Sequence, residues 1–159
     1  MSKRAKAKRV SPYRQRAIDP MGGLRTLSDR QPMNENQLTD LAIGYWLAFD
    51  NMTRRESTGY DWNIIAGSLN IAIVMCEEGI KEEALDIFRR SRDASLRAKK
   101  RGEEKGIWRY DGADIDTIRT ALSIHDQQIT QITQGRMVKV INDVRDRVER
   151  GHVINEVTA

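Results

Sequence analysis

The sequence is poor in the residues that cross-links, metal sites and membrane spans require. Its single cysteine, Cys76, excludes a disulfide within the chain and is typical of proteins from a reducing cytosol. The only histidines, His125 and His152, are scattered, so no cluster of metal ligands is predicted. No apolar run reaches the roughly 20 residues that a bilayer span needs, and no apolar segment follows the N-terminus as in a secretory signal. We therefore expect a cytoplasmic protein without membrane contact, metal or cofactor.

Acidic residues are absent from the first 18 positions, although basic residues are frequent there. This arm carries +7, whereas the rest of the chain, with 20 basic and 23 acidic residues, carries −3. Such a tract binds polyanions by neutralising phosphates, without reading base sequence. A basic tail that binds nothing is the alternative. We predict nucleic-acid contact through Lys3, Arg4, Lys6, Lys8, Arg9, Arg14 and Arg16.

A length of 159 residues suits one domain. Residues 1–33 contain all three prolines and no sustained apolar period, so we expect a largely disordered arm and linker. Its few apolar anchors, Leu24, Leu27 and Met33, are candidates for pinning its end to the body. Residues 34–150 are predicted to form a helical domain, and residues 151–159 a frayed tail.

The apolar spacing of the domain predicts an all-α bundle of four to five helices. Residues 61–78 are apolar on nearly every side, which is typical of a central buried helix. Its least apolar line is Asn63, Gly67 and Asn70. We expect the two asparagines to bond to a neighbouring element and Gly67 to permit close approach of that neighbour's backbone.

Helix boundaries are indicated by capping residues. Asn34 with Gln37, and Thr58 with Asp61, have the spacing of capping boxes. Gly79 is expected to end the central helix in a left-handed conformation. A further helix is predicted from Lys81 to about Arg101.

The last helical region leaves two alternatives open. Apolar residues recur at spacings of 3 and 4 from Ile115 to Ile132, but the next step, to Met137, is 5. Either the helix breaks near Gly135, or one helix of about 55 Å carries two differently aimed faces. The second case would leave one face for a partner, most simply a second copy, through Met137, Ile141, Val144 and Val148.

Catalytic patterns are not found. Cys76 and His125 could form a thiolate pair, but a cysteine among apolar residues is usually inert, and His125 is interpreted as a hydrogen-bonded core or interface residue. The carboxylates between Asp111 and Asp116 lack the spacing of a calcium loop and are interpreted as helix caps. The aromatic residues between Tyr45 and Trp62 are interpreted as packing rather than as a base-stacking platform. No enzyme activity is predicted.

Two resemblances accompany these patterns. Gly79, Ala84 and Phe88 resemble half of a tetratricopeptide repeat, but only one copy is found, so an ordinary helical hairpin is the preferred interpretation. The features of the second are Tyr13-Arg14, Trp62 to Asn70, Gly79, Gly106 to Tyr110, and Leu122 before His125-Asp126. Together they resemble small uncharacterised helical proteins of proteobacterial temperate phages. That resemblance implies a phage regulatory or accessory role and no active site.

The sequence thus favours a non-enzymatic phage-type regulatory or accessory protein that binds a host or phage target, with its basic arm on nucleic acid. The alternative is a protein-interaction or virion-assembly module that forms homo-oligomers, such as a homodimer, through its C-terminal helix.

Overall fold

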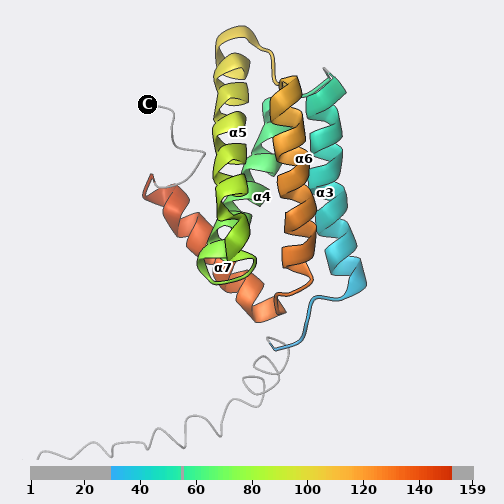
Figure 1. Ribbon diagram of the computed structural model, residues 1–159, viewed down its shortest axis with the longest axis vertical. Coiled ribbons are helices and arrows are strands. Elements are labelled where there is room, and N and C mark those ends of the chain that lie inside the picture. The colour runs from blue at the N-terminus through green and yellow to red at the C-terminus, as the bar shows by residue number, and fades with distance from the viewer. Residues whose placement is uncertain (1–29, 55, 152–159) are drawn as a thin grey trace, which may run out of the picture.

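The computed structural model describes residues 30–54 and 56–151. These residues form five α-helices and a 3-10 turn, with no strand among them, which confirms the predicted all-α bundle. The elements are α3 (Glu35–Arg54), α4 (Gly59–Glu77), η1 (Glu82–Ala84), α5 (Leu85–Lys105), α6 (Gly112–Ile129) and α7 (Gln134–Glu149). Helices α3 to α6 run side by side along the long axis, whereas α7 lies at an angle across one end (Figure 1).

Local side chains set the starts of α3 and α4 as predicted. The backbone N–H of Asn34 donates to Gln37 Oε1 at 3.0 Å, and the N–H of Gln37 donates to Asn34 Oδ1 at 2.9 Å. Thr58 and Asp61 form the corresponding capping box before α4. Each box satisfies backbone donors that have no partner inside the first helical turn. Gly79 follows α4 with φ at +86°, the left-handed conformation expected of it.

The third predicted helix differs from expectation at both ends. It starts with the 3-10 turn η1, preceded by Lys81 in a left-handed conformation, and α5 begins only at Leu85. It continues past Arg101 to Lys105 and ends at Gly106, which has φ at +69°. The extra turn contains Gly102, which lies against the Trp108 ring. Tertiary packing therefore extends this helix beyond the limit that its sequence suggests.

The region from Ile115 to Val148 is two helices rather than one. Helix α6 ends at Ile129, and the Thr133 hydroxyl accepts a hydrogen bond from the backbone N–H of Arg136 at the start of α7. Gly135 lies inside the first turn of α7, so the break precedes the position where it was expected. The short connection reverses the direction of the chain and brings α7 back onto α4.

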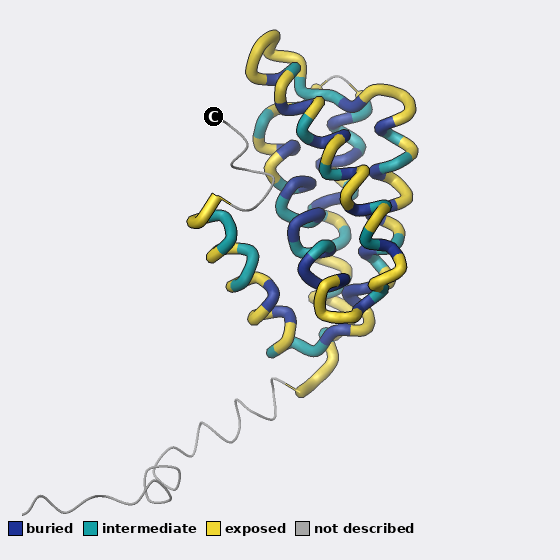
Figure 2. The backbone as a smooth tube through the Cα atoms, turned by 60° about the vertical axis from the view of Figure 1, so that its left-hand side comes forward, coloured by how far each residue is buried: buried dark blue, intermediate teal, exposed yellow. Residues whose placement is uncertain are grey.

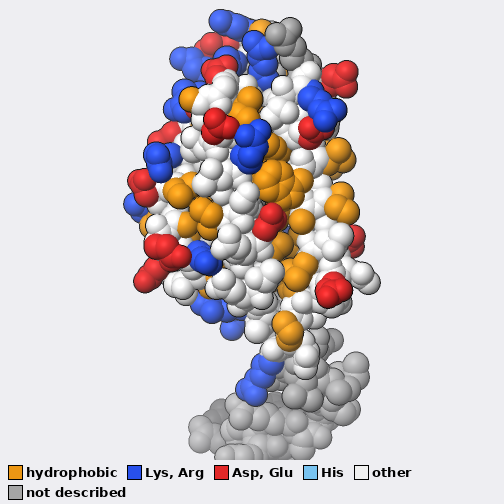
Figure 3. All heavy atoms as spheres, turned by 45° about the vertical axis from the view of Figure 1, so that its right-hand side comes forward, with side chains coloured by type: hydrophobic (Ala, Val, Ile, Leu, Met, Phe, Trp, Pro, Cys, Tyr) orange, Lys and Arg blue, Asp and Glu red, His pale blue; other side chains and the backbone are white. Residues whose placement is uncertain are grey.

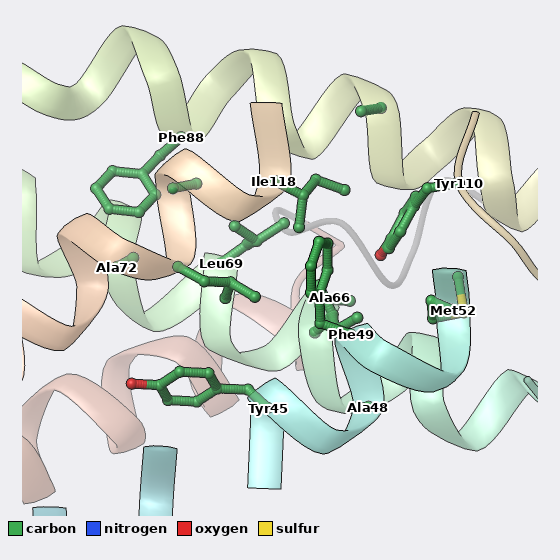
Figure 4. Packing of buried hydrophobic residues seen from close by; sticks show 14 of the residues in the cluster. Tyr45, Ala48, Phe49, Met52, Ala66, Leu69, Ala72, Phe88, Tyr110 and Ile118 are labelled. Carbon is green, nitrogen blue, oxygen red and sulfur yellow. The ribbon is translucent and has the colours of Figure 1, made fainter. Parts of the chain in front are cut away.

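Helix α4 is the central element because it contacts α3, α5, α6 and α7. Its first three turns contribute Trp62, Ile65 and Leu69 to the larger apolar cluster, where side chains from α3 to α6 meet (Figure 4). Its last turns contribute Val74 and Met75 to a smaller cluster with α7. One helix therefore joins both parts of the core.

The least apolar line of α4 does not behave as predicted. Asn63 is exposed, and a Cβ atom built on Gly67 would meet nothing within 4 Å. Asn70 is buried, yet its Nδ2 has no hydrogen-bond partner in the described part of the chain. The expected close approach at Gly67 is therefore wrong, because no atom of a neighbouring element in the described ranges lies within 4 Å of that position. The expected bond from Asn70 Nδ2 is also missing there, although other side chains bury the residue.

Candidate binding surfaces

The segment before α3 is fixed to the beginning of α7. The backbone N–H of Gln134 donates to Gln31 O at 3.0 Å, and Gln134 Nε2 donates to Pro32 O at 3.3 Å. Pro32 also forms an isolated antiparallel bridge with Thr133. Met33 packs on the smaller apolar cluster, as predicted for an anchor. Residues 31–33, which connect the arm and linker to α3, therefore lie beside the α6–α7 connection.

The remaining arm predictions fall outside the described residues. These are the seven basic residues and the two other anchors, Lys3, Arg4, Lys6, Lys8, Arg9, Arg14, Arg16, Leu24 and Leu27. Nucleic-acid contact through the arm stays a prediction.

The predicted partner face of α7 is only partly available. Met137 is 6% exposed and lies in the core with Val74 and Met75, so a partner cannot reach it. This corrects its assignment to the partner face, and the cause is the reversal at Thr133, which turns Met137 toward α4. Val144 packs partly on the same cluster and Val148 is half-buried.

Two other side chains of α7 point away from the core. Val138 is 56% exposed and Ile141 is 36% exposed. We call this pair the α7 patch. Its members lie one helical turn apart, so they form one continuous apolar surface. Partner binding by Ile141, Val144 and Val148 stays a prediction.

Ion pairs at both ends of α7 hold the helix across the end of α4. Arg136 contacts Glu78 through Nε–Oε2 at 3.0 Å and also donates to its backbone oxygen at 2.7 Å. Arg147 contacts Glu77 at 2.7 Å and Asp143 at 2.9 Å. Figure 2 shows α7 with buried positions toward the bundle and exposed positions on its other side. This attachment fixes the outward direction of the α7 patch.

Cys76 and His125 are brought together through a glutamine that the sequence reasoning missed. Gln128 is fully buried; its Nε2 donates to Ala72 O at 3.1 Å and to Ile80 O at 3.0 Å, and lies 3.2 Å from Cys76 Sγ. Its Oε1 lies 3.0 Å from His125 Nδ1. The available signal was its position three residues after His125, on the apolar side of α6.

This network lacks the electrostatics of a catalytic pair. Burial raises the pKa of the Cys76 thiol to about 11, and burial lowers the pKa of His125. The thiol is therefore protonated and the imidazole neutral near pH 7, whereas an activated cysteine requires a lowered pKa. His125 is a hydrogen-bonded core residue, as interpreted from the sequence.

Asp126 holds two aromatic side chains of α3. It accepts a hydrogen bond from the Tyr45 hydroxyl, and the Trp46 indole Nε1 lies 3.0 and 3.2 Å from its two oxygens. Burial, together with this carboxylate, raises the pKa of Tyr45. Phe49 and Trp62 are buried, so these aromatic residues pack as predicted. Tyr60 is the exception, because it is 73% exposed.

The α5–α6 loop forms a small pocket at the other end of the bundle. The pocket has a volume of about 260 Å³ and is lined by Ser57, Gly106, Ile107, Trp108 and Arg109. The Trp108 ring lies against Gly59 and Gly102. Gly59 belongs to α4 and Gly102 to α5. The indole therefore fills the space between these two helices and is not an open stacking platform.

Carboxylates near this loop serve in ion pairs. Asp111 precedes α6 but makes no side-chain cap, and it pairs with Arg101 at 3.0 Å. Asp114 pairs with Arg97 at 2.5 Å. The interpretation of these aspartates as capping side chains is therefore wrong for Asp111. Across the described ranges, no group of three or more His, Cys, Asp or Glu side chains is placed to hold a metal ion.

No helix within residues 30–54 or 56–151 has the length and apolar character that crossing a membrane requires. Comparisons with protein-family models, curated proteins and solved structures gave no match.

Proposed function

We propose that this protein is a non-enzymatic binding protein, of phage-type regulatory or accessory character, whose basic arm contacts nucleic acid. The observation that carries the proposal is the charge division, with +7 on residues 1–18 and −3 on the remainder. Seven charges without an acid attract phosphates, and neutralisation of each phosphate releases counterions. The body supplies a folded unit to which residues 30–33 attach beside α7.

The buried polar groups favour binding over catalysis. Gln128 satisfies Cys76 and His125 inside the core, and Asp126 binds Tyr45 and Trp46. These side chains therefore stabilise the bundle. Under this proposal, specificity toward a host or phage target comes from exposed surfaces of the body.

The test is binding of fluorescent DNA and RNA oligonucleotides by anisotropy over a range of salt concentrations. Replacing Lys3, Lys6 and Lys8 by Ala should weaken binding and make the slope of log K against log salt less negative by up to about 2.7, at roughly 0.9 per phosphate contact on duplex DNA. The matched control replaces Arg89, Arg90 and Lys100 of α5, which are exposed. Equal losses in both variants, or unchanged binding in the arm variant, would contradict the proposal.

The α7 patch supports the second candidate, a homo-oligomerising interaction module. Val138 and Ile141 expose apolar surface that a second copy would bury. Sedimentation of the chain at increasing concentration should show association, and Val138→Asp with Ile141→Asp should abolish it. The control places the same charges on exposed α6 positions, Ser123→Asp with Gln127→Asp. A strict monomer at every concentration would exclude this candidate.

A further inference from the structure

The negative charge of the body belongs to one half of it. Residues 35–80 contain two basic and seven acidic residues, whereas residues 81–151 contain sixteen basic and thirteen acidic residues. No lysine or arginine occurs in residues 35–53 or 59–80. The hairpin of α3 and α4 is therefore acidic, and the half formed by α5, α6 and α7 is weakly basic.

The outer side of α3 combines this charge with exposed apolar side chains. Asp40, Ile43, Leu47 and Asp50 follow one another at spacings of 3, 4 and 3, which places them on one face of the helix. Ile43 is 58% exposed and Leu47 is 59% exposed. We call these four residues the acidic stripe. Hydrophobic and acidic side chains gather on the side of the molecule that α3 occupies (Figure 3).

The two aspartates differ in their partners. Asp50 pairs with Arg54 at 2.9 Å, while Asp40 has no ion pair within the described part of the chain. Adjacent Gly44 leaves open space, since a Cβ atom there would meet nothing within 4 Å. An exposed apolar surface of this kind, rimmed by charge, is typical of an interaction site.

We propose that the acidic stripe docks the chain's own basic arm, residues 1–18. The charges are complementary, because the arm carries +7 without an acid and the stripe presents two carboxylates, Asp40 and Asp50, on a hairpin whose net charge is −5. The arm also contains apolar side chains, Val10, Tyr13 and Ile18, which match Ile43 and Leu47 in character.

The attachment point puts the stripe within reach. Residue 30 lies five positions before Glu35, where α3 begins, and the 12 residues between positions 18 and 30 extend over at most about 40 Å. The stripe itself is about 15 Å long, at 1.5 Å per helical residue. A contact that is weak between separate molecules becomes populated when a short linker gives a millimolar effective concentration.

Docking regulates the arm, and this consequence rests on the proposed function. An arm side chain that pairs with Asp40 or Asp50 cannot pair with a phosphate at the same time, and an arm that lies along α3 cannot also follow a nucleic-acid backbone. Nucleic acid must therefore displace the arm from the stripe. Replacing acidic-stripe residues should strengthen nucleic-acid binding several-fold at low salt.

The direct test uses the full-length chain without nucleic acid. A nitroxide on Ser2→Cys is selective because the native Cys76 is buried. Paramagnetic broadening of backbone amides should be strong at residues 40–50 and weak at Arg89, Arg90 and Asp93, which are exposed on α5. It should disappear in 0.5 M salt, at which the Debye length is only about 4–5 Å, and in the double variant Asp40→Lys, Leu47→Lys.

Controls separate this idea from its alternatives. Asp86→Lys with Asp116→Lys changes the same kind of charge at exposed positions of α5 and α6 and should leave the broadening intact. Broadening that spares α3, that survives the stripe variant, or that appears only between labelled and unlabelled molecules would overturn docking within the chain. Broadening at α3 in a protein that binds no nucleic acid would uphold the docking and refute the proposed function.

Discussion

Gln128 illustrates how one side chain can satisfy polar groups from three parts of the chain. Its amide contacts α4 at Ala72, the following turn at Ile80, and His125 on its own helix. Replacing it by Leu removes these bonds without a large change in volume. A buried polar group that loses its partner costs about 1–3 kcal/mol, so Gln128→Leu should lower the free energy of unfolding by that amount in urea titrations. The neighbouring Gln127→Leu is exposed and should change stability by less than about 0.5 kcal/mol.

His125 should make stability depend on pH. Burial lowers its pKa in the folded state, so the imidazole binds a proton more readily in the unfolded chain. The free energy of unfolding is therefore greatest at pH values above the ordinary pKa of about 6.5. It decreases as the pH is lowered further, by at most about 1.4 kcal/mol per pH unit. Urea unfolding at pH 7.5 and pH 5 measures this change, and His125→Asn should abolish it.

Asp61 acts in a separate range of pH. Burial opposes its ionisation, but hydrogen bonds from Asn51 and Thr58 outweigh burial and hold its pKa below the usual value. Its contribution to stability is present above the ordinary carboxyl pKa of about 4 and is lost only at lower pH.

A pH dependence of stability that His125→Asn leaves unchanged between pH 7.5 and pH 5 would contradict the assignment to His125.

At the scale of the element, two glycines inside helices have opposite surroundings. A Cβ atom on Gly102 of α5 would lie 2.3 Å from the Trp108 ring, whereas one on Gly67 of α4 would meet nothing. Alanine in a helix interior is favoured over glycine by about 1 kcal/mol. Gly67→Ala should therefore stabilise the protein by about 0.5–1 kcal/mol.

Gly102→Ala should destabilise it, because overpacking costs about 1–3 kcal/mol and exceeds the helical gain. Thermal unfolding measures whether each variant is more or less stable than the parent chain. Trp fluorescence should change only for Gly102→Ala. Stabilisation by both variants would show that Trp108 moves without cost.

The elements that sequence reasoning predicted well are those with local determinants. The capping boxes at Asn34 and Thr58 and the left-handed Gly79 depend on residues within one turn, so their spacing is visible in the sequence. The end of α5 and the surroundings of Gly67 depend on contacts between distant segments. Gln128 was missed for the same reason, because its partners in and after α4 are 56 and 48 residues away.

Across the whole molecule, α4 is the element on which both apolar clusters depend. The larger cluster draws on α3, α4, α5 and α6, while the smaller one attaches α7 through Val74 and Met75. Helix α7 contacts α4 more extensively than it contacts the other helices, and it carries only two buried residues, Met137 and Val140. It can therefore detach without breaking the larger cluster.

This asymmetry predicts two levels of hydrogen exchange. Amides of α4 within the larger cluster, around Leu69, should exchange only through global unfolding, whereas those of α7 should exchange through a local opening of lower free energy. Val140→Ala removes buried methyl groups, so it should speed exchange in α7 at least several-fold and leave exchange at Leu69 slower than in α7. The matched control is Val138→Ala, because Val138 is exposed. This variant should leave amide exchange unchanged in both helices. Equal protection of α4 and α7, measured by native-state exchange in low urea, would mean that the two clusters unfold as one unit.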